Sequence, residues 1–290
     1  MSFRANEVII NMKVQTFYKY QGAGNDFLIA DNRSGELQLS TEQIAALCDR
    51  RYGVGADGLM LLESSAEYDF RMVYYNSDGS GGMMCGNGGR CMVAFAADCG
   101  IELFDFDAAD GFHTAQILAV EGFRKTVRLK MKDVASIDHY ESLEGVGVPS
   151  EGSFLDTGTR HYVRFVTGLQ AYDIVSEGRD IRYNAVQLQP IGANVNYVEP
   201  FDGGVMVRTY EKGVEDETFA CGTGIVASCV ASYVKGVKPS EVAHGGRVKY
   251  DVVAKRDRLS VDFVPSDGSV AEDVWLTGPA TFVAEIKVNL

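Results

Sequence analysis

Two cysteines in this sequence stand in the same local surroundings. Residues 85–88 read Cys-Gly-Asn-Gly and residues 221–224 read Cys-Gly-Thr-Gly, 136 positions apart in a chain of 290. About three turns of small and apolar residues at helical spacing follow each motif. The spacing therefore predicts that Cys85 and Cys221 each lie at the start of a helix.

A cysteine at a helix start can take part in proton transfer. The positive end of the helix dipole and the free backbone N–H groups of the first turn favour the thiolate, so we expect the thiol pKa to fall from about 8.5 toward neutrality. The glycines allow these N–H groups to approach a carboxylate closely. Two such helix starts facing each other would place one sulfur on each side of an α-carbon. That arrangement suits inversion of a stereocentre, in which one thiolate removes the α-proton and the opposite thiol supplies another.

Three helices are expected to position these and neighbouring residues. Residues 40–43 (Ser-Thr-Glu-Gln) have the capping-box pattern, and apolar residues at helical spacing follow as far as a predicted stop at Gly53. The other two helices follow Cys85 and Cys221 and consist of small residues, as a helix buried inside a curved sheet requires. The repeated motif indicates two similar halves with one cysteine each.

Most of the remaining chain predicts strands, because short runs rich in Val, Tyr, Phe and Ile lie between Gly, Asp, Asn or Ser turns. The expected strands are residues 14–20, 27–31, 70–75, 126–131, 161–166, 195–198, 205–210, 247–253 and 259–264. The predicted fold class is therefore α+β, dominated by strands.

Composition narrows the range of partners. The formal net charge of −13 disfavours nucleic acid, whose phosphates are bound through Lys and Arg, but a local site can still hold a small anionic substrate. No apolar run approaches the roughly 20 residues of a membrane span. The first residues lack the apolar stretch of a secretory signal, so we expect a short extension before a start near Met12 and a cytoplasmic protein.

The six cysteines are expected to be reduced thiols, because the chain is large and carries no secretory signal. A zinc site is disfavoured, since no Cys-x-x-Cys pair occurs and the four histidines do not cluster with the cysteines in the sequence. The cysteines other than Cys85 and Cys221 lie on or just behind apolar helical faces, and core packing is their simplest role.

Other polar segments could contribute to a site, although each taken singly is more simply explained as structure. Residues 22–27 and 76–80 place amides and carboxylates beside tight turns, and residues 210–212 (Tyr-Glu-Lys) could form a solvated face. His161 follows Asp-Thr-Gly-Thr-Arg at a loop-to-strand junction. A lone histidine at such a junction is usually structural.

Taken together, these segments resemble the diaminopimelate epimerase family from about Val14 to the end of the chain. The two cysteine motifs at this separation are highly specific, whereas any other segment alone would be weak. The matching segments are residues 24–27 (Gly-Asn-Asp-Phe), 51–58 (Arg-Tyr-Gly-Val-Gly-Ala-Asp-Gly), 76–80 (Asn-Ser-Asp-Gly-Ser), 84–91 (Met-Cys-Gly-Asn-Gly-Gly-Arg-Cys), Gly158 with His161, 194–197 (Asn-Val-Asn-Tyr), 210–211 (Tyr-Glu), 217–218 (Glu-Thr), 220–224 (Ala-Cys-Gly-Thr-Gly) and 276–280 (Leu-Thr-Gly-Pro-Ala).

The resemblance implies two pseudo-symmetric domains, each a strongly curled, mostly antiparallel sheet wrapped around a central helix, with the site between them. We place the N-terminal half at residues 12–122, completed by a C-terminal strand at 276–290, and the C-terminal half at 123–275. The implied activity is interconversion of LL- and meso-diaminopimelate on the route to lysine and peptidoglycan precursors, without pyridoxal phosphate or a metal. The sequence leaves open whether the chain forms a homodimer.

The resemblance also assigns roles to individual residues. Cys85 and Cys221 are implied to be the acid/base pair, assisted by His161 and Glu211. Backbone N–H groups would hold the α-carboxylate, and polar side chains would recognise the rest of the substrate. The implied N–H donors are Gly86, Asn87, Gly222 and Thr223, and the implied recognition residues are Asn25, Asn76 and Asn194.

Three departures from the family pattern concern substrate recognition. Residues 159–161 read Thr-Arg-His where Asn-Pro-His is usual, and Thr159 keeps a hydrogen-bonding group. Lys212 stands where arginine is usual, so a cation remains but the bidentate geometry is lost. The loop between Lys212 and Cys221 carries one extra residue. We therefore count Thr159 and Lys212 among the expected substrate contacts.

Two alternatives remain at this point. The chain could be a related cofactor-independent amino-acid racemase with a different distal substrate group, as in proline-racemase-like enzymes. It could also be a redox switch or binding protein in which Cys85 and Cys221 form a disulfide. Fold relatives that isomerise phenazine precursors lack the cysteine pair, which argues against that activity here.

Overall fold

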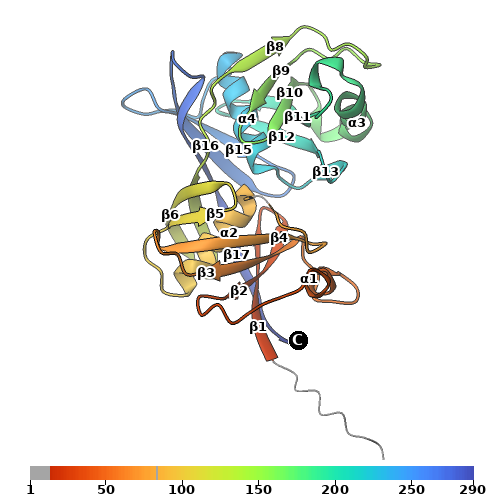
Figure 1. Cartoon of the computed structure of the whole chain (residues 1–290). Coiled ribbons are helices and arrows are strands. Elements are labelled where there is room, and N and C mark those ends of the chain that lie inside the picture. Colours follow the sequence, from red (N-terminus) through yellow and green to blue (C-terminus); the bar gives the residue numbers. More distant parts are fainter. Residues whose placement is uncertain (1–13, 83) are drawn as a thin grey trace, which may run out of the picture.

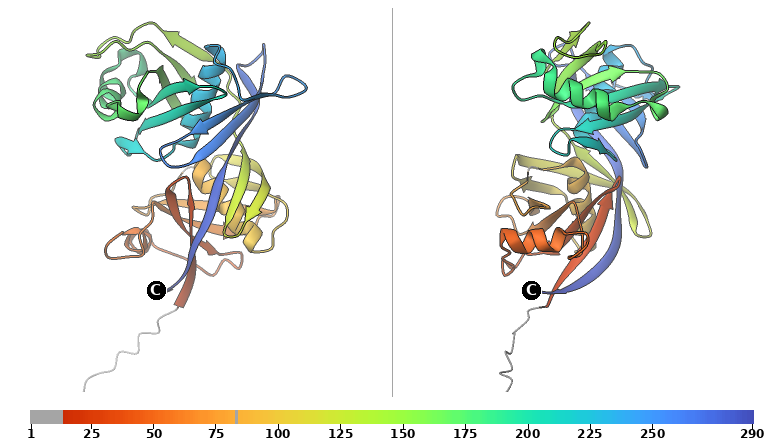
Figure 2. Two further views of the ribbon diagram at one scale, coloured as in Figure 1. Left: turned by 180° about the vertical axis from the view of Figure 1, so that it is seen from behind. Right: turned by 90° about the vertical axis from the view of Figure 1, so that its right-hand side faces the viewer.

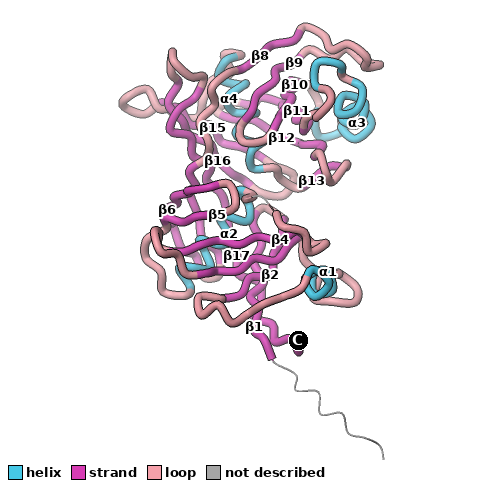
Figure 3. Tube along the Cα trace, in the orientation of Figure 1, coloured by secondary structure: helices cyan, strands magenta, loops and turns pink. Residues whose placement is uncertain are grey.

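Two helices of the protein are each surrounded by strands, and two others lie outside the sheets. The computed structural model describes residues 14–82 and 84–290, and the expected start near Met12 lies outside these residues. Figure 3 shows the arrangement, with the helices in cyan. The helix bounds are α1 (Thr41–Cys48), α2 (Gly86–Asp98), α3 (Ile174–Asn184) and α4 (Gly222–Val234), with short 3₁₀ turns at Leu169–Ala171 and Val186–Leu188.

The strands of the N-terminal half form a closed barrel around α2 (Figure 1). Each strand pairs with the next along the chain, and the second part of β17 (Ala271–Asn289) closes the barrel by pairing with both β7 and β1. The other strands of this half are β1 (Val14–Gly22), β2 (Asn25–Asp31), β3 (Gly58–Glu63), β4 (Phe70–Asn76), β5 (Asp105–Ala108), β6 (Gly111–Glu121) and β7 (Arg124–Lys130).

The C-terminal half repeats this topology around α4. The pair β10–β11 is parallel like β2–β3, and β12–β15 is parallel like β4–β5, while the pairs that follow are antiparallel. Helices α1 and α3 also occupy equivalent places in the order of elements. The strands of this half are β8 (Ile137–Tyr140), β9 (Gly152–Asp156), β10 (Arg160–Phe165), β11 (Asn194–Phe201), β12 (Gly204–Glu211), β13 (Asp216–Thr218), β14 (Glu241–Val242), β15 (Val248–Val253) and β16 (Arg258–Pro265).

Strand β17 connects the two lobes. Its first part pairs with β16, and from Gly278 onward it pairs with β7 and then with β1. Figure 2 shows this long blue strand running from one lobe along the other to the C-terminus. The predicted division at residues 122 and 123 falls in the turn of the β6–β7 hairpin, and the domain boundaries stay a prediction.

Small residues allow α2 and α4 to fill the centres of the lobes. In α2 every residue from Gly86 to Ala96 is buried, and in α4 burial extends from Gly222 to Ser232 apart from the half-buried Thr223. The predicted fold class, with two curled, mostly antiparallel sheets each around a central helix, is confirmed.

Local sequence signals located three of the four α-helices and nine of the 17 strands in the described residues, and they missed the other strands and some element ends. Ser40 and Gln43 form the predicted capping box, but α1 ends at Cys48 rather than near Gly53, so the expected stop was wrong. Helix α3 was not predicted. Its turns bury only Ile174, Gly178 and Ile181, and an interior glycine in a polar segment is weak support for a helix.

Candidate active site

The starts of α2 and α4 lie against each other at the junction of the two lobes. Cys85 is the N-cap residue of α2, and Cys221 is the N-cap residue of α4. A Cβ atom placed on Gly222 would lie 3.5 Å from the Cα atom of Gly86 and 3.1 Å from Cδ2 of Leu276. A Cβ atom on Gly222 would therefore be crowded by the Leu276 side chain, whereas one on Gly86 would meet its neighbours at ordinary contact distances of 3.4 Å or more. The expectation that the two helix starts face each other agrees with this contact.

Both thiols are free, and both are held in the protonated form. Burial raises the pKa of Cys85, and the backbone N–H of Gly88 opposes this only in part, while the carboxylate of Glu211 raises it further. Burial and the same carboxylate raise the pKa of Cys221 well above its ordinary range. The expected fall in thiol pKa was therefore wrong, because loss of hydration outweighs the helix-start N–H groups.

An asparagine of the first motif connects the two lobes. Nδ2 of Asn87 donates to the carbonyl oxygen of Ala220 at 2.9 Å and to Oδ1 of Asn25 at 3.5 Å. The thiol of Cys85 donates to the same Oδ1 atom at 3.8 Å. Asn25 in turn donates to the carboxylate of Asp57 at 2.6 Å. The predicted residues Asn25 and Asn87 thus lie together beside Cys85.

Arg90, one turn into α2, supports this arrangement. Its guanidinium is fully buried and donates to the carbonyl oxygens of Gly86 and Pro279 and to Oδ1 of Asn87. All three acceptors are uncharged, and no ion pair joins Arg90 to a carboxylate in the part of the chain that the structure describes. Arg90 was not among the predicted site residues, although a charged residue inside a buried helix pattern is a usable signal.

A cluster of hydroxyl groups connects His161 to the start of α4. Nε2 of His161 lies 2.9 Å from Oγ1 of Thr159 and 2.9 Å from Oγ1 of Thr223. The two hydroxyl groups lie 3.0 Å apart, and Oγ1 of Thr223 lies 3.5 Å from Sγ of Cys221. The structure thus brings Thr159, His161 and Thr223 together beside Cys221.

His161 is neutral at ordinary pH. It is fully buried, and burial lowers its pKa to about 3. Its Nδ1 atom faces Nδ2 of Asn196 at 3.0 Å, and Oδ1 of Asn196 accepts from the hydroxyl of Thr209 at 2.9 Å. Neither Asn196 nor Thr209 was among the predicted site residues. Asn194 directly precedes the predicted strand 195–198, and the alternation of side chains along an extended chain places Asn194 and Asn196 on one face, which could have indicated the second.

Glu211 lies close enough to both thiols to raise their pKa values. Burial raises the pKa of Glu211 itself, and the hydroxyl of Thr218 donates to it at 2.8 Å. Asn194 holds the strands on either side of it, since Nδ2 donates to the carbonyl oxygen of Arg160 and Oδ1 accepts from the backbone N–H of Lys212. The Lys212 side chain is exposed.

Asn76 is the candidate least connected to the others. It ends β4, opposite Gly58 and so next to Asp57, which binds Asn25. Its side chain is exposed and donates to Oγ of Ser80 at 3.0 Å. Within residues 14–82 and 84–290, no hydrogen bond joins it to another predicted site residue.

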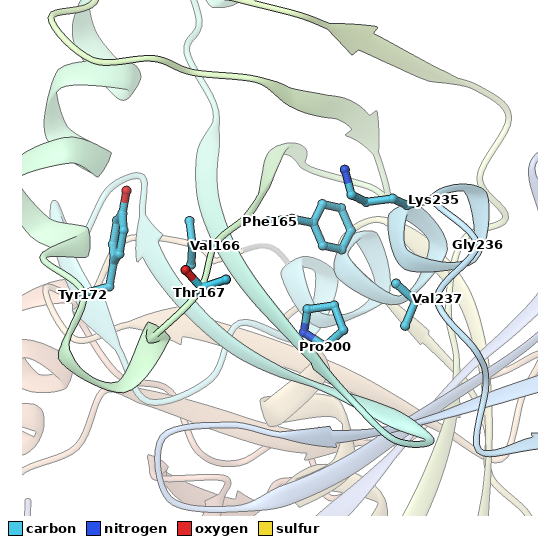
Figure 4. A pocket seen from close by; sticks show the side chains of 8 residues that line it. All are labelled: Phe165, Val166, Thr167, Tyr172, Pro200, Lys235, Gly236 and Val237. Atoms are coloured by element: carbon cyan, nitrogen blue, oxygen red, sulfur yellow. The ribbon is translucent and has the colours of Figure 1, made fainter.

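A separate cavity of about 550 Å³ lies at the opposite end of α4 from Cys221. Figure 4 shows Lys235 and Tyr172 at its two sides, with Phe165 and Pro200 between them. None of the predicted site residues lines it. Over the described ranges, no group of three or more His, Cys, Asp or Glu side chains is placed to hold a metal ion, and no helix is long and apolar enough to cross a membrane.

Comparison with known proteins places the chain in a family. The sequence model of the family described as diaminopimelate epimerase matches residues 17–123. Diaminopimelate epimerase of Flavobacterium psychrophilum is 41% identical over 278 residues, which cover 93% of this chain and 99% of that protein. The chain belongs to the diaminopimelate epimerase family. The family's enzymes of Chlorobaculum tepidum and Aquifex aeolicus are 41% and 36% identical and also match over more than nine tenths of both chains.

Solved structures share the fold at much lower identity. A PhzF-family phenazine biosynthesis protein from Bacillus anthracis superposes with a TM-score of 0.68 at 16% identity, covering 96% of this chain and 100% of that one. A hydroxyproline epimerase from Agrobacterium vitis superposes with a TM-score of 0.66 at 15% identity, covering 96% and 93%. These likenesses support the fold class alone, whereas the family rests on the sequence relatives.

Proposed function

We propose that the protein interconverts LL- and meso-diaminopimelate by proton transfer between Cys85 and Cys221. The observation that carries this proposal is the contact between two Cys-Gly-x-Gly helix starts, one from each lobe, in a member of the diaminopimelate epimerase family. We place the reaction in the cytoplasm, on the route to lysine and peptidoglycan precursors. The proposed reaction uses neither pyridoxal phosphate nor a metal.

The α-carboxylate of the reacting centre would bind between the helix starts. Backbone N–H groups in the first turn of a helix have no partner within the helix, and those of Gly86, Asn87, Gly222 and Thr223 are the proposed donors. The buried Arg90 adds a positive charge beneath them and opposes the rise in the pKa of Cys85. Anionic substrate groups and the carbanion formed at the α-carbon are stabilised by the same donors.

The proton transfer requires one thiolate and one thiol. The thiolate takes the α-hydrogen as a proton and leaves its bonding electrons on the α-carbon, and the opposite thiol then donates its proton to the other face. Because burial and Glu211 raise the pKa of both thiols, a cation must offset this rise when the substrate binds. The α-ammonium group of the substrate supplies such a charge, since a nearby positive charge favours the thiolate.

Recognition of the far end of the substrate would distinguish diaminopimelate from smaller amino acids. The proposed contacts are Asn25, Asn76, Thr159, Asn194 and Lys212. Lys212 is the cation among them, and its exposed side chain is free to reach the distal carboxylate. A charge-assisted hydrogen bond is worth about 1.5–3 kcal/mol, so Lys212→Met is expected to raise KM about ten- to a hundredfold. Steady-state kinetics measures this change. The control is Lys238→Met, which replaces an exposed lysine at the other end of the same lobe.

Deuterium exchange at the α-carbon tests the reaction and the substrate together. The protein is incubated in deuterated water with LL-diaminopimelate, meso-diaminopimelate, lysine and proline, and exchange and inversion are followed by NMR and chiral chromatography. We expect deuterium incorporation with inversion for the two diaminopimelates only. Inversion of proline in preference to diaminopimelate would establish the related-racemase alternative. If the two thiols form a disulfide and no deuterium is incorporated into any substrate, the redox-switch alternative would be favoured.

A further inference from the structure

The buried side of His161 contacts an amide that the proposed mechanism has not yet used. Nδ2 of Asn196 lies 3.0 Å from Nδ1 of His161 and 3.4 Å from the carbonyl oxygen of Tyr162. Asn196, His161 and Thr209 are all buried from solvent. Bulk water therefore does not reach these contacts, and each polar atom needs a hydrogen-bond partner in the interior.

The neighbours of Asn196 fix the orientation of its amide group. A carbonyl oxygen accepts hydrogen bonds and cannot donate, so the Asn196 atom that faces the Tyr162 carbonyl must be the nitrogen. The hydroxyl of Thr209 donates to the other atom, Oδ1. The second hydrogen on Nδ2 then points at Nδ1 of His161, which must accept it.

We infer that Asn196, held by Thr209, is a positioning residue that keeps His161 as the neutral tautomer with its proton on Nε2. This inference rests on the proposed function for its catalytic consequence. The Nε2–H group faces the hydroxyls of Thr159 and Thr223. When the Thr223 oxygen accepts from Nε2–H, its own proton is free to point at Sγ of Cys221, 3.5 Å away. The network therefore supports the thiolate form of Cys221 during proton transfer.

The second glycine of the Cys221 motif has a role in the same network. A Cβ atom on Gly224 would lie 2.3 Å from Oδ1 of Asn196 and 3.2 Å from Cε1 of His161. Only a glycine at this place lets α4 approach the amide and the ring so closely. The motif therefore serves the tautomer of His161 as well as the binding of a carboxylate.

The substitution Asn196→Asp tests the inference, because it preserves shape and replaces a donor by an acceptor. The ionised carboxylate would draw a proton onto Nδ1 of His161. Long-range proton–nitrogen NMR spectra of the full-length protein report which ring nitrogen is protonated, and the spectrum of His161→Gln identifies the signals of this ring among the four histidines. We expect Nε2–H alone in the unmodified protein and a protonated Nδ1 in Asn196→Asp. We expect kcat to fall about ten- to a hundredfold with a smaller change in KM, while the same substitution at the exposed Asn289 changes neither.

A second pair of variants covers the case in which Asn196→Asp does not fold. Thr209→Val removes the hydroxyl that orients the amide and should lower kcat and leave the tautomer mixed, and Thr209→Ser should restore both. Nδ1–H in the unmodified protein, or a changed tautomer with unchanged kcat, would overturn the inference. The tautomer is read without substrate, so a failure here is distinct from failure to epimerise diaminopimelate, which would overturn the proposed function instead.

Discussion

At the scale of single residues, the chemistry of the proposed site depends on groups that set the charge state of two thiols. Glu211 and burial favour the neutral thiols, whereas Arg90 and the N–H groups of the helix start favour the thiolate of Cys85. The balance lies toward the thiol because hydration is lost on burial. Residue types alone could identify the cysteines, but they could not show which of these opposing effects is larger.

Removing either cysteine of the pair is expected to abolish epimerisation. Cys85→Ala and Cys221→Ala each leave one side of the α-carbon without a group that can carry a proton. The measurement is the rate of inversion of both diaminopimelate isomers, with folding checked by circular dichroism. Cys99→Ala, at a half-buried cysteine following α2, should keep most of the activity. Substantial turnover by either the Cys85→Ala or the Cys221→Ala variant would contradict the two-base mechanism.

Replacing Glu211 is expected to change the pH at which the thiols react. The Glu211 carboxylate raises the pKa of both cysteines, so Glu211→Gln should lower both values. Alkylation requires the thiolate. As the pH is raised, alkylation of Cys85 and Cys221 should therefore begin at a lower pH in Glu211→Gln than in the unmodified protein. Iodoacetamide labelling followed by mass spectrometry measures this at each cysteine. Glu151→Gln, at an exposed carboxylate, is the control, and an identical pH profile for Glu211→Gln would show that Glu211 does not act on the thiols.

At the scale of elements, the N-terminal ends of the two buried helices position the thiols and the N–H groups that are proposed to bind the α-carboxylate. Sequence periodicity located α2 and α4 because a run of small and apolar residues follows each cysteine. It could not show that the starts touch, since that contact depends on the packing of Gly86, Gly222 and Leu276. It also missed α3, whose buried face consists of few apolar side chains.

Adding a methyl group inside the Cys221 motif is expected to disturb the site more than the fold. Alanine is favoured over glycine within helices by up to about 1 kcal/mol, but the Cβ of Gly224→Ala would overlap Oδ1 of Asn196. Overpacking of this kind costs about 1–3 kcal/mol, so thermal stability should fall moderately. We expect kcat to fall at least tenfold because His161 and Asn196 must shift. Gly268→Ala, at an exposed turn with space for a Cβ atom, should behave like the unmodified protein, and an unchanged kcat in Gly224→Ala would contradict the proposed role of the network.

At the scale of the whole molecule, the proposed site exists only where the two lobes meet. Strand β17 joins them by pairing with β16 in one lobe and with β7 and β1 in the other. Asn87 adds a direct bond from α2 to the Ala220 carbonyl, next to Cys221. The docking of the lobes therefore sets the distance between the proposed acid and base.

Weakening the bond between Asn87 and Ala220 is expected to loosen this junction. In Asn87→Ala the Ala220 carbonyl loses its donor, and Arg90 loses one of its acceptors. An unmatched buried acceptor costs about 1–3 kcal/mol, so the free energy of unfolding should fall by about that amount. Hydrogen exchange near residue 220 should become faster than in the control Asn289→Ala, at an exposed residue. Unchanged exchange there would show that Asn87 does not hold the lobes together.

The sequence by itself determined the local part of this protein. The repeated Cys-Gly-x-Gly motif predicted both helix starts, the apolar runs predicted about half of the strands, and the ordered motifs indicated the family, because these features depend on short-range spacing. Only the tertiary structure decided the charge state of Cys85 and Cys221 and the roles of Arg90, Asn196 and Thr209. These properties depend on burial and on partners far away in the sequence. Arg90, for example, donates to a carbonyl 189 positions away, and Asn87 to one 133 positions away.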